Sequence, residues 1–378
     1  MKPLKFLTYT SAFAVAGASM SKGAGIPGSF LMIGALIFLH EMGHFLFAKR
    51  MGIPVEVFSL GFGPRLCGFK WRETDVRLSV FPMGGYVRLL GYNPEEPEAK
   101  DPNGFLNQPY GPRMLFYSGG ILANLLTAFV LLWAVGVDRS RVTSATPAPA
   151  PLQVYEVAPK FPAAMAGILP GDLIHQVGDL HFPGATNTQA VSFIQDHPGQ
   201  PIPVTLERAG KTQILLVTPK DEGGSGRLGI MFQPTKLILT RRPLALKDFW
   251  TGSFSGLRTL RSSTVLVLQG YGRLVSFHSS MKELGGPIAI IKEGSSAVQQ
   301  GWATFCLFMA FISVNLAVLN AIPIPFLDGG HMVMLTIERL MGKDLPAEIK
   351  ERVLTGGFIF MVALMGFVFA LDLMRLRG

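Results

Sequence analysis

Long apolar stretches with very few charged residues alternate with polar segments along this chain of 378 residues. Four stretches reach the length of a membrane-spanning helix, for which roughly 20 apolar residues are needed. They are residues 26–48, 113–137, 301–337 and 353–373. The third is interrupted by Pro323 and Pro325, which disturb helix geometry. The pattern therefore predicts an α-helical polytopic membrane protein with about four core transmembrane helices.

The segments before and after the first span have mixed character. Residues 1–25 form an N-terminal extension that resembles either a signal-peptide core or a membrane-associated helix. Residues 49–112 are rich in Gly and Pro, with strand-like runs at 55–60 and 76–81. Non-helical backbone is tolerated at membrane depth only where protein or water shields it. This loop is therefore either a β-hairpin that enters the membrane or an ordinary cytoplasmic hairpin.

A Pro/Ala linker at residues 138–151 leads into a β-rich segment, residues 152–236. The segment contains short strand-like runs and the sequence AGILPGD at residues 166–172. This run resembles the signature of PDZ modules, which bind extended peptides by adding them to a sheet edge. We expect one inserted PDZ-like domain here, and the alternative is a small β-rich domain without a binding role.

Residues 237–300 combine an amphipathic helix with a linker. Apolar residues such as Leu246, Phe249 and Trp250 recur every three to four positions, with Arg258 and Arg261 among them. Such a helix is expected at the membrane surface. The alternative is a soluble helix packed on the PDZ-like domain. Residues 338–352 form a loop of balanced charge before the last span.

Composition narrows the class of protein. With 49% hydrophobic and 16% charged residues, the chain is too apolar for an ordinary soluble enzyme of this size. The net charge of +9 fits basic loops that face anionic lipid, and no compact basic and aromatic patch favours nucleic acid as a partner. Cys67 and Cys306 lie far apart and no CxxC occurs. The sequence therefore argues against a disulfide framework and against a cysteine-based zinc site.

The sequence HEMGH at residues 40–44 lies inside the first span. His40 and His44 are four residues apart, so both imidazoles lie on one face of a helix and can reach one metal ion. Glu41 is then placed to act on a water bound to that ion. This is the zinc metalloprotease pattern. Ionisable residues within a membrane are costly and mark functional sites, so we expect a zinc site within the membrane.

A catalytic zinc usually has a third protein ligand and an open position for water. Asp328 is the leading candidate because it is the only acid in the third span and follows the two prolines. His331, three residues later, is the competing ligand. Asn320 either hydrogen-bonds a substrate carbonyl and its oxyanion or satisfies backbone groups freed by the prolines. We expect Asn124, a lone polar residue in the second span, to form an interhelical hydrogen bond.

The predicted reaction is hydrolysis of a peptide bond. Zinc lowers the pKa of its bound water and polarises the scissile carbonyl. Glu41 takes the proton from this water and later passes it to the leaving amine.

HExxH, together with the sequence NAIPIPFLDG at residues 320–329, resembles the site-2 protease family of intramembrane zinc metalloproteases. The likeness runs from about residue 26 to residue 376 and is strongest to bacterial members that cleave anti-sigma factors, the regulator-of-sigma-E-protease type. It implies His40, His44 and Asp328 as Zn²⁺ ligands, Glu41 as the general base, and a substrate-binding role for Asn320. Some relatives carry two PDZ modules, whereas only one fits between the second and third spans here.

The resemblance also implies a cellular setting. Members are multi-pass proteins of the bacterial inner membrane, with the PDZ module extracytoplasmic and the active site towards the cytoplasm. Their substrates are single-pass membrane proteins already cut by another protease, such as anti-sigma factors or signal-peptide remnants. Two other functions remain open: a membrane metallopeptidase for prenylated or soluble peptides, and a membrane scaffold that binds peptides. Intact Glu41 argues against the scaffold.

Overall fold

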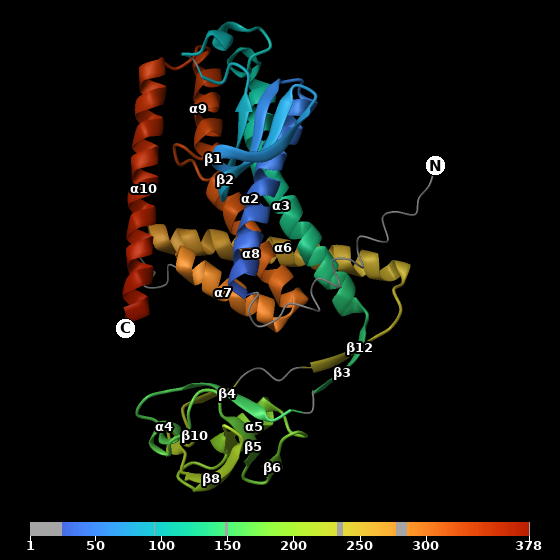
Figure 1. Cartoon of the computed structure of the whole chain (residues 1–378), viewed down its shortest axis with the longest axis vertical. Coiled ribbons are helices and arrows are strands. Elements are labelled where there is room, and N and C mark those ends of the chain that lie inside the picture. The colour runs from blue at the N-terminus through green and yellow to red at the C-terminus, as the bar shows by residue number, and fades with distance from the viewer. Residues whose placement is uncertain (1–24, 94, 148–149, 233–236, 277–285, 378) are drawn as a thin grey trace. The chain divides into compact units, whose positions relative to one another are not determined.

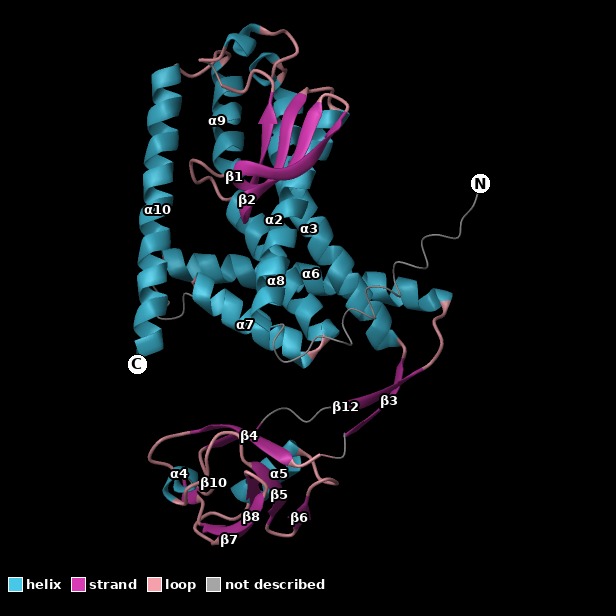
Figure 2. Cartoon of the chain, in the orientation of Figure 1, coloured by secondary structure: helices cyan, strands magenta, loops and turns pink. Residues whose placement is uncertain are grey.

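The computed structural model describes residues 25–93, 95–147, 150–232, 237–276 and 286–377. The chain forms two compact units. The first runs to Ser140 and resumes at Ala245, and the second is Arg141–Leu244. Figure 2 shows that helices dominate the first unit and strands the second. Nearly all of the predicted N-terminal extension, residues 1–25, lies outside the described residues.

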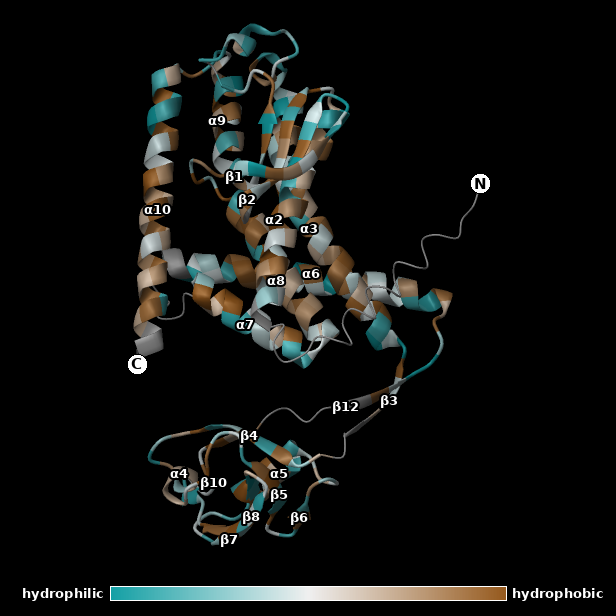
Figure 3. Ribbon diagram, in the orientation of Figure 1, coloured by the Kyte–Doolittle hydropathy of each residue, from teal (hydrophilic) through white to brown (hydrophobic). Residues whose placement is uncertain are grey.

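The helices of the first unit are α2 (Gly25–Arg50), α3 (Tyr110–Ser140), α6 (Leu246–Val275), α7 (Pro287–Gln300), α8 (Trp302–Ala321), α9 (Asp328–Met341) and α10 (Ala347–Arg377). Among the described residues, α2, α3, α8 and α10 contain stretches long and apolar enough to cross a membrane. Figure 3 shows apolar residues along these helices. The expected third span is two helices, α8 and α9, because Pro323 and Pro325 interrupt the backbone hydrogen bonds between them.

Glycines allow the backbones of α2 and α3 to come into direct contact. A Cβ atom on Gly43 would lie 2.2 Å from the carbonyl oxygen of Gly119, and one on Gly119 would lie 2.8 Å from the carbonyl oxygen of Gly43. Small residues are the usual means by which membrane helices approach so closely. This contact fixes the part of α2 that carries HExxH against α3.

The amphipathic helix α6 packs within the first unit. It shares a buried apolar cluster with α3 and α8, made of Ala128, Leu132, Val267, Ala310, Val314 and Val318. Figure 1 shows α6 running crosswise to α2, α3 and α8. Helix α6 therefore packs on the apolar helices of the first unit.

The predicted hairpin is present and longer than its sequence runs suggest. It consists of β1 (Val55–Trp71) and β2 (Thr74–Leu89), followed by two 3-10 turns, Pro97–Lys100 and Phe105–Asn107. Bulges fold the strands so that residues 57–60 pair with 75–78 on one side and with 85–88 on the other. Its base packs on α2 through Phe45, Ala48, Ile53, Val55, Phe58 and Leu89. The hairpin is thereby anchored beside the HExxH helix.

Helix α10 is the most peripheral of the four apolar helices. Only 6% of its apolar stretch is buried, against 28–33% in the other three. Near its C-terminal end, the buried carboxylate of Asp372 accepts hydrogen bonds from the backbone N–H groups of Gly286, Ile288 and Ala289, at 3.1, 3.0 and 3.3 Å. Two of these groups belong to the first turn of α7, where helical partners are lacking. The sequence predicted a linker at this position, not helix α7.

The second unit contains the motif AGILPGD, and we call it the PDZ-like unit. Its main sheet has the order β11-β4-β5-β7-β8, with β6 paired to β5. The strands are β4 (Leu152–Val157), β5 (Leu173–Val177), β6 (Leu180–His181), β7 (Ile202–Arg208), β8 (Lys211–Val217) and β11 (Ile230–Phe232). Helices α4 (Pro162–Met165) and α5 (Asn187–Gln195) complete the unit, together with the short pair β9 (Lys220–Asp221) and β10 (Gly226–Arg227). Its core includes Val154, Ile168, Ile174, Val204 and Leu206.

A two-stranded ribbon replaces part of the expected Pro/Ala linker. Strand β3 (Val142–Pro147) pairs antiparallel with β12 (Leu237–Arg241). The whole PDZ-like sheet lies between the two partner strands in the sequence, so local propensity could not reveal their pairing. The segments that enter and leave the PDZ-like sheet are therefore hydrogen-bonded to each other.

Candidate metal centre

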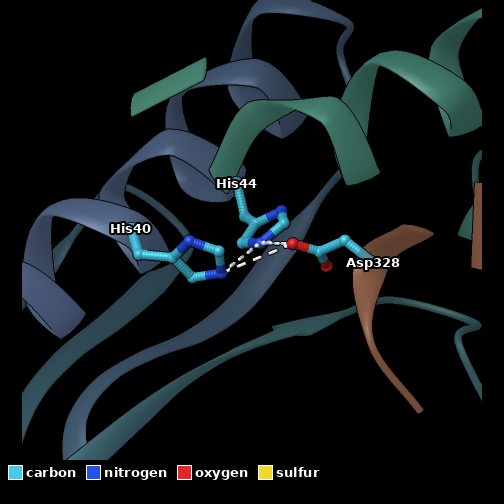
Figure 4. A group of neighbouring side chains, drawn as sticks. All are labelled: His40, His44 and Asp328. Atoms are coloured by element: carbon cyan, nitrogen blue, oxygen red, sulfur yellow. Dashed lines mark hydrogen bonds and ion pairs between the residues drawn. The ribbon is translucent and has the colours of Figure 1, made fainter. Parts of the chain in front are cut away.

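Two histidines of α2 place their ring nitrogens side by side. His40 and His44 lie one helical turn apart on the same face of the helix. Their Nε2 atoms are 3.2 Å apart, and His44 is buried. Figure 4 shows both rings directed towards the same point. The two predicted ligands of the HExxH motif are thus brought together.

Asp328, the first residue of α9, completes the group. Its Oδ2 atom lies 3.4 Å from Nε2 of His40 and 3.3 Å from Nε2 of His44. Within the described part of the chain this buried oxygen has no hydrogen-bond partner. A buried carboxylate is costly unless it is hydrogen-bonded or faces a cation. The arrangement in Figure 4 therefore suits a cation between the three side chains.

The distances fit a zinc ion. His40, His44 and Asp328 offer ligand atoms that form a triangle with edges of 3.2, 3.4 and 3.3 Å. Nitrogen and oxygen ligands about 2.0–2.1 Å from a tetrahedral zinc ion lie about 3.3–3.4 Å from one another. Two nitrogens, one oxygen and an open fourth position are the usual donor set of a catalytic zinc. The residues present therefore match the predicted cofactor.

Hydrogen bonds to the other ring nitrogens orient both histidines. Nδ1 of His44 lies 2.8 Å from the carbonyl oxygen of Phe116, so it carries a proton and leaves Nε2 free for a metal. Nδ1 of His40 lies 3.1 Å from the side-chain amide of Asn124. With that amide turned so that Oδ1 accepts from Nδ1, its buried oxygen gains a partner and His40 takes the same tautomer. The interhelical hydrogen bond predicted for Asn124 is confirmed, and its partner is a proposed ligand.

Helix α3 packs against the two imidazoles through a glycine. A Cβ atom on Gly120 would lie 2.4 Å from Cε1 of His40 and 2.4 Å from Nε2 of His44. No side chain fits at this position without moving the rings. This role of Gly120 could not be predicted from the sequence, because it depends on how closely α2 and α3 approach.

Glu41 lies between the ligand pair and the hairpin. It directly follows His40 on α2. On the other side, a Cβ atom on Gly85 would lie 2.8 Å from Cγ of Glu41. The absence of a side chain at Gly85 thus allows the hairpin to touch the candidate base.

The remaining predicted residues lie outside the triangle. His331, the competing ligand, stacks on the ring of Tyr117 with centroids 4.7 Å apart and an angle of 2°. The group of three that could hold a metal includes Asp328 and not His331 among the described residues. Asn320 is half-buried near the end of α8. The geometry therefore favours Asp328 as the third ligand.

Fold and site together describe a metalloprotease with helices able to span a membrane. The model of peptidase family M50 matches residues 28–364. The chain belongs to this family, the site-2 proteases, and is a zinc-dependent metalloprotease. The family, the enzyme class and the cofactor predicted from the sequence are thereby confirmed.

Similar proteins occur in bacteria and plants. A protein of Nostoc sp. (strain PCC 7120) is 33% identical over 355 residues, which cover 90% of this chain and 93% of its own. Membrane metalloprotease ARASP of Arabidopsis thaliana, a chloroplast protein, is 30% identical and the match covers 96% and 82% of the two chains. Zinc metalloprotease RasP of Oceanobacillus iheyensis is 25% identical, with 92% and 98% covered. Among solved structures, the PDZ domain of an SdrC-like protein from Listeria monocytogenes is 19% identical, with a TM-score of 0.21, and the match covers 23% of this chain and 92% of that one.

Proposed function

We propose that this protein is an intramembrane endopeptidase that cleaves the transmembrane segments of single-pass membrane proteins. The observation that carries the proposal is the position of the three candidate ligands along the apolar helices. His40 and His44 lie within Pro27–Arg50, a stretch long and apolar enough to cross a membrane, and Asp328 joins them from α9. A metal site at that depth acts on substrates that lie in the bilayer.

The mechanism assigns each residue a distinct task. His40, His44 and Asp328 hold the zinc ion, which supplies Lewis acidity to the reacting water and carbonyl when bound. The carboxylate of Glu41 removes a proton from the attacking water and later delivers it to the leaving amine. Phe116 and Asn124 keep Nε2 of each histidine directed at the metal.

The hairpin is assigned the task of presenting the substrate. A scissile peptide bond must leave its helix and become extended before water can reach it. Residues 85–88 of β2 pair with β1 on one side, and within the described strands their other edge is free. Gly85 at this edge touches Glu41. A substrate strand added there would pass directly beside the base.

Apolar side chains on the hairpin support its insertion into the membrane. Phe62, Leu66, Phe69 and Phe81 are 48–63% exposed. Such a set on a loop would be costly in water and stabilising in lipid. The hairpin therefore acts as a membrane-entering β-loop rather than as an ordinary cytoplasmic hairpin.

Asn320 is assigned to substrate binding. Pro323 has no N–H to donate to the carbonyl of Leu319, and this carbonyl accepts instead from Ile322 N–H at 3.2 Å. The freed carbonyl of Leu319 therefore does not need the Asn320 side chain as a partner. Its amide is thus available to donate to a substrate carbonyl and its developing oxyanion.

The proposed location is the bacterial inner membrane. Lys49 and Arg50 end α2, and by the positive-inside rule they support a cytoplasmic location for that end. His40 and His44 are nearer to this end, so the active site lies towards the cytoplasmic side. Helix α3 then crosses back, and the PDZ-like unit that follows it is extracytoplasmic.

The PDZ-like unit is proposed to admit substrates already cut by another protease. Strand β11 lies at the edge of its sheet, which is where PDZ-type modules add an extended peptide. A segment of an anti-sigma factor or a signal-peptide remnant would bind there.

Cleavage in proteoliposomes tests the proposal. The purified full chain is reconstituted with a single-pass model substrate, and the products are mapped by mass spectrometry. We expect a cut inside the transmembrane segment that stops when a chelator removes zinc and resumes when zinc is restored. Cutting only outside the membrane, or equal cutting without zinc, would refute the proposal.

A further inference from the structure

The turn that leads into Asp328 is packed tightly against α9. We call residues 322–327, which connect α8 to α9, the proline turn. Cβ atoms on Gly329 and Gly330 would lie 2.4 Å from the carbonyl oxygen of Ile322 and 2.2 Å from that of Ile324. The proline turn thus lies directly on the first turn of α9, and any movement of it is transmitted to Asp328.

Helix α10 also contacts the proline turn. A Cβ atom on Gly357 would lie 2.5 Å from both Cβ and the carbonyl oxygen of Pro325. The next residue, Phe358, packs its ring on Phe326 with centroids 5.3 Å apart and an angle of 62°. We call Gly357 and Phe358 the α10 clamp.

The proline turn contains a backbone conformation that needs support. Phe326 has a φ of 80°, in the left-handed region that residues other than glycine rarely adopt. Such conformations persist only where the surroundings impose them. The clamp packs on Phe326 and on Pro325 before it, and Asp328 is only two residues further on.

We propose that the α10 clamp positions the third metal ligand by holding the proline turn against α9. This inference rests on the proposed metal site and adds α10, which contributes no ligand to it. Ligand distances at a metal are maintained within about 0.2 Å. A methyl group at Gly357 would require a shift of about 1 Å to reach ordinary contact distance. Displacement of the turn, or retreat of α10 from Phe326, would move Asp328 out of the triangle.

A neighbouring glycine provides a matched control. A Cβ atom on Gly356 would meet nothing within 4 Å. Gly356→Ala and Gly357→Ala therefore make the same chemical change at successive positions of one helix, and both raise helix propensity equally. They differ in whether the new methyl group meets the proline turn.

The test measures metal binding by the full chain in detergent or nanodiscs. Zinc affinity is obtained by competition with a chelator, and the d–d absorption of the cobalt-substituted protein reports the coordination geometry. We expect Gly357→Ala to bind zinc about 10–100-fold more weakly and to alter the cobalt spectrum, as changes behind metal ligands typically do. Gly356→Ala should match the wild type in both measurements.

Three further variants make the result decisive. His44→Ala removes a proposed ligand. If this variant binds zinc as tightly as the wild type, the metal site itself is refuted. If His44→Ala loses zinc while Gly357→Ala matches Gly356→Ala, the clamp is refuted and the site stands. Should Gly357→Ala not fold, Phe358→Ala is compared with Phe360→Ala, which removes the same atoms. The two side chains are similarly exposed, 48% and 54%, and the ring of Phe358 is the one that packs on Phe326 among the described residues. Equal zinc affinity in that pair would refute the clamp.

Discussion

Replacing Gly120 by alanine tests whether α3 shapes the metal site. The new Cβ would lie 2.4 Å from both Cε1 of His40 and Nε2 of His44. Carbon atoms pack best at about 3.5–4.0 Å, so the rings must move by about 1 Å or more. That is several times the tolerance of about 0.2 Å for metal–ligand distances. We expect zinc affinity to fall by about 10–100-fold, which corresponds to about 1.4–2.8 kcal/mol.

The assay compares Gly120→Ala with Gly111→Ala on the same helix. A Cβ atom on Gly111 would meet nothing within 4 Å, so this control should bind zinc like the wild type. Zinc affinity is measured by chelator competition, and circular dichroism checks that helix content is retained. A Gly120→Ala variant that is folded and binds zinc with wild-type affinity would show that α3 does not confine the two imidazoles.

Three further predictions concern other contacts. Asp328→Ala should lose zinc in elemental analysis whereas His331→Ala retains it, and the reverse pattern would make His331 the third ligand. Asp372→Ala removes the acceptor of the N–H groups of Gly286 and of two residues in the first turn of α7, and should cost about 1–3 kcal/mol. Its thermal midpoint should therefore be lower than that of Asp372→Asn, and equal midpoints would contradict the capping role. In the PDZ-like unit, hydrogen bonds from Arg208 lower the pKa of Asp172 below its usual value. In an acid unfolding series, Arg208→Gln should therefore lower the stability by its full amount above about pH 4. The stability difference from the wild type should vanish as the pH falls through the lowered pKa of Asp172. A difference that stays constant with pH would exclude an electrostatic origin.

Much of the metal site follows from periodicity alone. Spacing of four residues puts His40 and His44 on one helix face in any α-helix, so the pair needs no tertiary information. Asp328 was identifiable because a lone acid after two prolines in an apolar stretch is costly unless a cation compensates its charge. Asn124 carried a similar signal, as a lone polar side chain in a span, although its partner His40 did not follow from the sequence.

Contacts between distant segments were beyond sequence reasoning. The closeness of Gly120 to the imidazoles and of Gly85 to Glu41 depends on helix and strand placement, and a glycine gives no chemical signal of its own. Helix α7 gives little signal in the sequence because its capping acid, Asp372, lies on another helix. Strand β3 has no local signal in the Pro/Ala segment because its partner, β12, follows the whole PDZ-like sheet.

The most direct test of the proposed mechanism is Glu41→Gln, measured for both cleavage and zinc content. Glutamine keeps the size of the side chain beside Gly85 but cannot accept the proton of the attacking water. We predict that the full chain carrying Glu41→Gln retains one zinc ion per molecule and no longer cleaves a reconstituted transmembrane substrate. Undiminished cleavage with zinc bound would contradict the role of Glu41 as the general base.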